Sequence, residues 1–144
     1  MTTYKEELTN IFQGELAAVN AYETVIAKVD QEPVAKRLRD IKSQHEKASQ
    51  LLKGWLQLEG QSTPKDAGTW GSFTKSLTKA SSVLGEYSAL AILKQGEEHG
   101  RRKYKELLSK ADLTRSVREA ISTQMLPLHD IHISSLDGMM KYTK

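Results

Sequence analysis

Apolar side chains recur every three or four residues along almost the whole of this 144-residue chain, which is the spacing of helices that pack one face inward. No segment shows the two-residue alternation of a half-buried β-strand, and only 9 glycines and 3 prolines interrupt the pattern. The spacing predicts an all-α fold of four helices, each of about 25–29 residues and therefore about 40 Å long. The stripes that carry this prediction are Leu8, Ile11, Phe12, Val19, Tyr22 and Ile26; Leu38, Ile41, Leu52 and Trp55 or Leu56; Leu90, Leu93, Tyr104, Leu107 and Leu108; and Val117, Ile121, Met125, Leu128, Leu136 and Met139.

Polar or proline-containing segments mark where these helices begin and end. Thr3 and Glu6 have the spacing of a capping box at the start of the first helix. Pro33 suits the first turn of the second helix. Residues 60–71 hold three glycines and a proline and are the one long connection, followed by an expected short helix at 72–80.

The connections indicate how the helices are arranged. Ser81 and Ser82 are expected to precede the third long helix, and residues 112–114 to precede the fourth. A short turn, a long crossover and a short turn predict an antiparallel four-helix bundle in one domain, 1–144. Pro127 is expected to kink the fourth helix beside His129.

The chain contains an internal repeat. Gln13-Gly14-Glu15 and Tyr22 match Gln95-Gly96-Glu97 and Tyr104 at an offset of 82 residues. His45-Glu46 and His129-Asp130 match more weakly at an offset of 84. The sequence therefore predicts two duplicated helical hairpins, at about 3–59 and 82–141.

Five ionisable residues lie where the apolar stripes would otherwise continue. They are two acids and three histidines: Glu15, His45, Glu97, His129 and His132. A buried carboxylate costs several kcal/mol unless it is paired, protonated or bound to a metal. Their convergence from four helices therefore requires a compensating interaction.

On these residues the chain resembles the ferritin-like superfamily of four-helix bundles. In that superfamily the first and third helices each supply a Glu, and the second and fourth each supply Glu-x-x-His, together holding two metal ions. Glu15 and Glu97 match the single acids, and His45 and either His129 or His132 match the histidines. More closely, the chain is similar to an uncharacterised bacterial family of ferritin-like bundles described only as a domain of unknown function, which implies a fold and no established activity.

The chain departs from the two-metal pattern. Lys42, rather than a Glu, lies three residues before His45, and His129 lies three before His132. A lysine in place of a bridging carboxylate opposes the binding of two cations. A single iron, zinc or manganese ion held by Glu15, Glu97, His45 and His129 or His132 is one hypothesis. The alternative is a structural or protein-interaction bundle, in which each Glu accepts a hydrogen bond from a His or Tyr across the core.

Other functional classes find less support. The absence of cysteine excludes thiolate sites, and no nucleotide, hydrolase or zinc-protease motif occurs, so we expect no catalysis. The net charge of +3 is too mild to indicate nucleic acid, and the basic run at 101–105 is interpreted as a solvated face, with phosphate binding as the alternative. His99 is expected on the surface, and Trp70 and Phe73 are expected to cap one end of the bundle or to dock on a partner subunit.

The expected location is the cytoplasm. No apolar run is long enough to cross a membrane, and residues 1–7 do not look like the start of a secretory signal. A homo-oligomer is compatible with the sequence, which identifies no small-molecule ligand.

Overall fold

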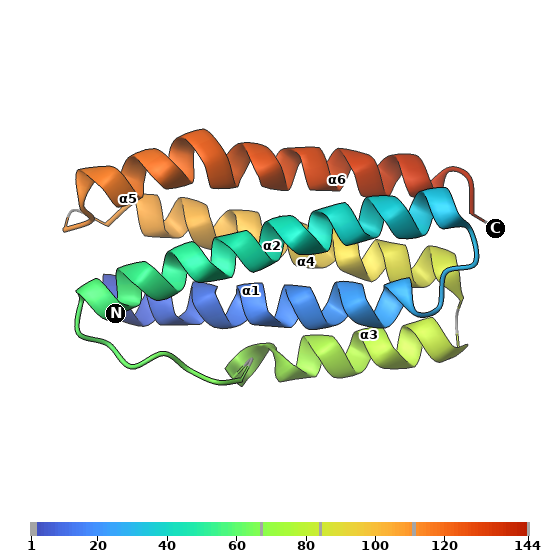
Figure 1. The fold of residues 1–144 in the computed structure, drawn as a ribbon, viewed down its shortest axis with the longest axis horizontal. Coiled ribbons are helices and arrows are strands. Elements are labelled where there is room, and N and C mark those ends of the chain that lie inside the picture. The colour runs from blue at the N-terminus through green and yellow to red at the C-terminus, as the bar shows by residue number, and fades with distance from the viewer. Residues whose placement is uncertain (1–2, 67, 84, 111, 144) are drawn as a thin grey trace.

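The computed structural model describes residues 3–66, 68–83, 85–110 and 112–143, and these form helices and the turns between them, with no strand. The all-α prediction is therefore confirmed for the described residues. The long helices are α1 (Tyr4–Ile26), α2 (Glu32–Leu58) and α4 (Glu86–Leu108), and a last helical stretch runs through α5 (Arg115–Ala120), η2 (Ile121–Met125) and α6 (Leu126–Met140). α1 packs against α2 and α4, and α4 packs against α6 (Figure 1).

Local sequence signals explain three of the helix starts. The Thr3 hydroxyl accepts from the Glu6 backbone N–H at 3.2 Å, and the Glu6 carboxylate accepts from the Thr3 N–H at 3.4 Å. Pro33 lies in the first turn of α2, as predicted. The Thr114 hydroxyl caps α5 by accepting from the Val117 N–H at 3.4 Å.

The long connection folds into a 3₁₀ turn, η1 (Gly68–Trp70), and a helix, α3 (Gly71–Val83), that lies along α1 and α4 (Figure 1). The extra helix predicted at 72–80 is present and is longer than expected. The predicted boundary at Ser81 and Ser82 is wrong, because both residues belong to α3. The next helix instead begins after Gly85, whose φ of 89° is a conformation that residues with a Cβ avoid.

The last helical stretch changes its winding before Pro127. Residues Ile121–Met125 form a π-helical segment, and α6 begins directly after it with Pro127 in its first turn. A proline lacks the backbone N–H and crowds the carbonyl four residues earlier, which a widened turn accommodates. The kink predicted at Pro127 stays a prediction, and the irregularity that the structure shows is the π-helical segment on the N-terminal side of Pro127.

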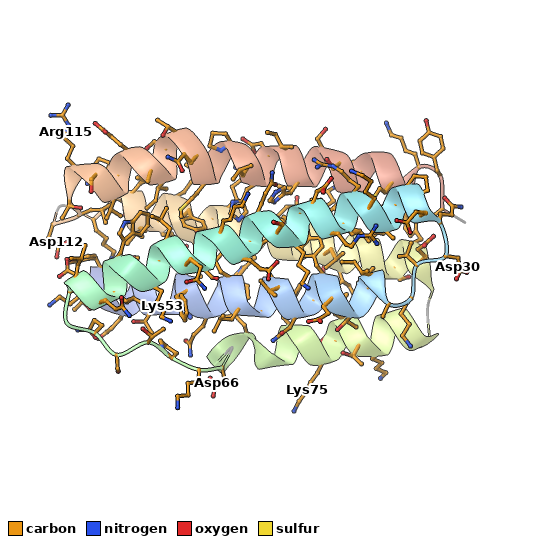
Figure 2. All side chains as sticks on the ribbon, viewed as in Figure 1. Asp30, Lys53, Asp66, Lys75, Asp112 and Arg115 are labelled. Carbon is orange, nitrogen blue, oxygen red and sulfur yellow. The ribbon has the colours of Figure 1, made fainter. Side chains whose placement is uncertain are left out.

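The apolar core consists of two clusters, one toward each end of the bundle. One cluster contains Tyr4, Leu8, Ile11, Phe12, Leu52, Leu56, Tyr104, Leu107, Leu113, Val117, Ile121 and Met125. The other contains Ala21, Tyr22, Val25, Leu38, Ile41, Leu77, Ala89, Leu90, Leu93, Leu136 and Met139. Charged side chains such as those of Lys75 and Arg115 project outward (Figure 2), and Lys53 is exposed. Among the described residues, no helix combines the length and the apolar character that crossing a membrane requires.

Candidate metal centre

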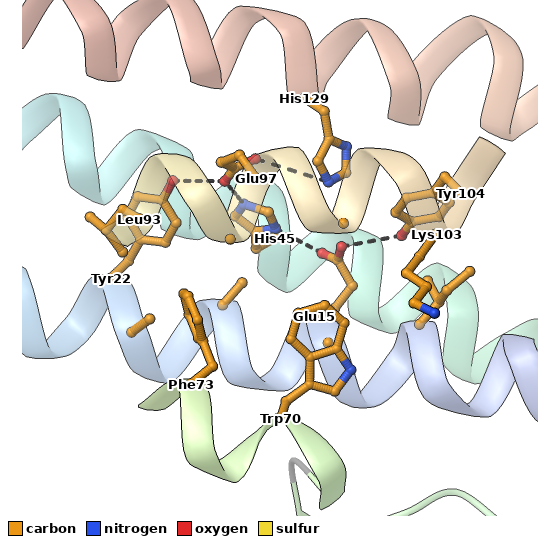
Figure 3. Close-up of a pocket in the computed structure, with 16 residues that line it drawn as sticks. Glu15, Tyr22, His45, Trp70, Phe73, Leu93, Glu97, Lys103, Tyr104 and His129 are labelled. Atoms are coloured by element: carbon orange, nitrogen blue, oxygen red, sulfur yellow. Dashed lines mark hydrogen bonds and ion pairs between the residues drawn. The ribbon is translucent and has the colours of Figure 1, made fainter. Parts of the chain in front are cut away.

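All five ionisable residues predicted inside the bundle are buried there, between the two apolar clusters. Their exposed fractions are 4% for Glu15, 3% for His45, 3% for Glu97, 4% for His129 and 2% for His132. They come from α1, α2, α4 and, for the last two, α6. Four of them face one another in Figure 3. The side chains that the sequence placed on four separate stripes therefore meet in one cluster.

His45 lies between the two carboxylates. Its Nδ1 is 2.8 Å from Glu15 Oε2, and its Nε2 is 2.6 Å from Glu97 Oε2. Burial lowers the pKa of His45, but attraction to Glu97 and Glu15 outweighs burial and holds that pKa well above 6.5. Burial raises the pKa of Glu97, but His45 and its other partners hold it well below 4.5. The geometry thus describes an imidazolium that donates to a carboxylate on each side.

Each acid also accepts a hydrogen bond from the tyrosine of the other repeat. Tyr22 donates to Glu97 Oε2 at 2.7 Å, and Tyr104 donates to Glu15 Oε1 at 3.2 Å. Burial, followed by the neighbouring carboxylates, raises the pKa of both phenols well above 10. The alternative prediction was a hydrogen bond to each Glu from a His or a Tyr, and each Glu has partners of both kinds.

Three histidine nitrogens face the Glu97 carboxylate. His45 Nε2 lies 2.6 Å from Oε2, while His132 Nδ1 lies 2.9 Å and His129 Nε2 3.9 Å from Oε1. One ligand atom each from His45, Glu97 and His132 fall within 4.8 Å of one another. We call the three nitrogens that face Glu97, namely His45 Nε2, His132 Nδ1 and His129 Nε2, the inner nitrogens.

The second nitrogen of each ring, which we call the outer nitrogen, faces an oxygen of another residue, which we call its outer oxygen. His129 Nδ1 donates to the Met125 carbonyl at 2.8 Å, and His132 Nε2 lies 2.5 Å from Gln44 Oε1. The outer oxygen of the third ring is the Glu15 carboxylate. Sequence reasoning missed Gln44 and Met125, and no sequence signal marks either, because their roles depend on how the helices are rotated against one another.

A two-metal site would need a carboxylate at position 42, and the structure shows what the lysine there contacts instead. Lys42 Nζ lies 4.0 Å from Glu23 Oε1 on α1, and its side chain is 25% exposed. Among the described residues, the cluster that could hold an ion contains one carboxylate, that of Glu97. The donors therefore suit one ion better than two.

A cavity of about 30 Å³ adjoins the cluster between α1 and α4, with space for about one water molecule. Glu15, Glu97 and His129 contribute to its lining, and Trp70 and Phe73 cover it (Figure 3). The prediction that these two aromatic residues cap one end of the bundle is wrong. They lie against the middle of α1 and α4 instead, where glycines leave space for the rings.

The basic run at 101–105 does not form one surface. Arg101 pairs with Asp130 at 2.7 Å, and Lys103 lies 3.5 Å from Glu106. Tyr104 is fully buried within the same run. Because these basic side chains pair with different acidic neighbours, the run gives no support to the binding of phosphate or nucleic acid.

His99, expected on the surface, is partly buried, with its ring 4.9 Å from that of Trp70.

The raised pKa of His45 predicts how the stability of the metal-free protein depends on pH. The folded state retains a proton at His45 that the unfolded state loses above pH 6.5, so stability should fall as the pH rises from 6.5 toward the higher folded value. The expected slope is up to about 1.4 kcal/mol per pH unit. Urea unfolding in chelator between pH 6.5 and 9.5 measures it. His45→Gln should remove this decline, and an equal slope in both proteins would contradict the assignment.

The profile of one protein family matches residues 3–110, which include α1 to α4 with Glu15, His45 and Glu97, and end before His129 and His132. Neither curated proteins nor solved structures yield a match. The matching family is described as a domain of unknown function, DUF2383. Because the match covers well over half of the 144 residues, the chain belongs to the DUF2383 family.

Proposed function

We propose that this DUF2383 chain binds one divalent transition-metal ion at the buried cluster. Glu97, His45 and His132 are the principal ligands, and His129 is the fourth. The observation that carries the proposal is the convergence of the three inner nitrogens on one buried carboxylate. Glu15 acts one step further out, as the acceptor that orients the His45 ring.

The outer oxygens support this assignment. A histidine ligates a metal through an unprotonated nitrogen and usually donates its other N–H to a carboxylate, carbonyl or water, which fixes the ring. Each of the three rings has such an oxygen beside its outer nitrogen. When each ring keeps its proton on the outer nitrogen, the three inner lone pairs can ligate a cation beside the Glu97 carboxylate, and for His45 this requires the ion to displace the proton on Nε2.

Charge balance also favours an ion. Two ionised carboxylates and the protonated His45 give the cluster a buried net charge of −1. A divalent ion that displaces the His45 proton brings this charge to zero. Binding should therefore release protons and weaken as the pH falls.

The donor set fits iron, zinc or manganese. Metal bonds to imidazole and carboxylate are about 2.0–2.2 Å long, so two ligands of one ion lie at most about 4.4 Å apart. The His45, Glu97 and His132 atoms lie within 4.8 Å of one another, close to this limit, and the His45–Glu97 and His132–Glu97 hydrogen bonds, at 2.6 and 2.9 Å, have to open as the ion enters between them. Mixed nitrogen and oxygen ligands are compatible with all three metals.

We extend the proposal to the architecture. The exchange of tyrosine hydrogen bonds between the two repeats supports a ferritin-like antiparallel bundle, built as one domain over 1–144 from duplicated hairpins at about 3–59 and 82–141. In this arrangement each hairpin contributes one acid and at least one histidine to the centre.

Metal analysis tests the proposal. Protein purified without chelator should contain about one ion per chain, and adding iron, zinc or manganese to the metal-free protein should raise its Tm. Proton release into a weakly buffered solution should accompany the titration. Substoichiometric metal together with an unchanged Tm for all three ions would overturn it.

A structural role is the second candidate, and one observation favours it. Both oxygens of Glu15 and both oxygens of Glu97 already have partners within the protein. If this network only fixes helix register, Glu15→Gln should be tolerated or stabilising, because a neutral amide costs less to bury. A large loss of stability in Glu15→Gln would argue against this candidate.

A further inference from the structure

The repeated Gln-Gly-Glu motif places a glycine before each buried acid, and each of these glycines faces an aromatic ring. A Cβ on Gly14 would lie 2.7 Å from Cζ2 of Trp70, and a Cβ on Gly96 would lie 2.6 Å from Cζ of Phe73. Real Cβ contacts are not this short, so the rings occupy notches that only glycine leaves open. Gly54, also inside a helix, has no such neighbour within 4 Å. The two repeat glycines therefore accommodate the crossover.

The two rings lie between the centre and the outside of the molecule. Trp70 and Phe73 line the inner cavity beside Glu97, and they also line an outer pocket of about 580 Å³. The outer pocket reaches solvent, because its lining includes the exposed residues Gln95 and Arg102. An ion that crosses this face of the bundle has to pass the two rings.

The segment that carries the rings is held by a small number of side chains. One turn beyond Phe73, Leu77 is fully buried in an apolar cluster, and Phe73 packs against the same cluster. The Trp70 indole N–H donates to the Asn10 carbonyl at 3.0 Å. Positive φ angles, among the described residues, occur at Gly60 before η1, at Gly68, the first residue of η1, and at Gly85 after α3. Such glycines allow backbone rotation without a Cβ clash, so Gly68 offers a bending point two residues before Trp70.

We propose that η1 and the first turn of α3 form a lid that must lift for a metal ion to reach or leave the centre. This inference rests on the proposed function. Trp70 and Phe73 donate no ligand atom, so the lid affects the rates of binding and release equally and leaves the equilibrium nearly unchanged. The glycine of each repeat is thereby assigned a role in exchange, separate from that of the acid that follows it.

Rates of cobalt exchange test the lid, with cobalt(II) as the spectroscopic probe. Trp70→Ala and Gly14→Ala should each accelerate both cobalt uptake and chelator-driven release roughly tenfold, while Kd changes by less than about threefold. Gly54→Ala is the matched control and should leave both rates unchanged. In the double variant, Gly14→Ala should add nothing to Trp70→Ala, because both act through the same ring.

A metal-free measurement separates the possible failures. In a Trp55→Phe background Trp70 is the sole tryptophan, and Gly14→Ala should increase quenching of its fluorescence by acrylamide, whereas Gly54→Ala should not. Unchanged quenching in Gly14→Ala would contradict the notch. Cobalt binding with wild-type rates in Trp70→Ala would overturn the lid and leave the proposed function intact. No cobalt binding by the wild-type protein would overturn the proposed function, and the lid with it.

Discussion

Glu97→Gln is expected to lower the affinity of the chain for a divalent ion by more than about a hundredfold. Substituting an outer partner of a metal ligand typically costs about 10–100-fold in affinity, and the loss of a ligand costs more. Glu97 supplies the single carboxylate toward which all three inner nitrogens point. A neutral amide keeps the shape of the side chain but removes the charge that balances the ion.

Two further variants make this result specific. Glu15→Gln should cost only about 10–100-fold, because Glu15 is assigned to the outer side of the His45 ring. Glu98→Gln removes the neighbouring, exposed carboxylate and should have no effect. Competition with a chelator of known affinity measures all three. Wild-type affinity in Glu97→Gln would contradict its role as a ligand, and equal losses in Glu15→Gln and Glu97→Gln would contradict the outer role of Glu15.

Glu97→Ala is expected to lower the free energy of unfolding of the metal-free protein by about 3–5 kcal/mol, the cost of removing one partner from a buried ion pair. The substitution leaves His45, His132 and the Tyr22 hydroxyl without their shared acceptor. It also opens a cavity in a buried layer of the bundle. Urea unfolding in chelator measures the loss.

The control is again the adjacent residue. Glu98→Ala should change the free energy of unfolding by no more than about 0.5 kcal/mol, because the side chain is exposed. The double variant Glu97→Ala and His45→Ala should cost less than the sum of the single variants, since the two residues act as a pair. Additive costs would contradict the pairing of Glu97 with His45, and a loss below about 1 kcal/mol in Glu97→Ala would show that the buried network contributes little to stability.

Periodicity predicts which residues of a helix face inward, and for this reason the sequence identified the two acids and three histidines that are buried among the described residues. The acids and histidines occupied positions in apolar stripes, so packing the stripes together had to bring them inside. The capping box at Thr3 and the position of Pro33 were also predictable, because they depend on contacts within a few residues. Local rules therefore account for the helix starts and for burial.

Contacts between helices required the structure. The partners of the outer nitrogens, Gln44 and Met125, depend on the rotation and axial offset of α2 and α6, which an apolar stripe leaves free. The π-helical segment before Pro127 ends at Met125, whose carbonyl accepts from His129 Nδ1. Trp70 and Phe73 were misplaced because a connection has no periodicity to position it, and only the glycine notches reveal where the rings pack.

The crossed hydrogen bonds from Tyr22 and Tyr104 have a consequence for the chain as a whole. Neither repeat supplies the tyrosine that donates to its own acid, so a fragment that ends in the crossover would leave one carboxylate without the phenol that lies on the missing piece. Each fragment would thus lack a buried hydrogen-bond donor that only the other fragment supplies. A chain split within 61–66 should regain its helical order only when the two pieces are mixed, because both pieces contribute side chains to the buried layer.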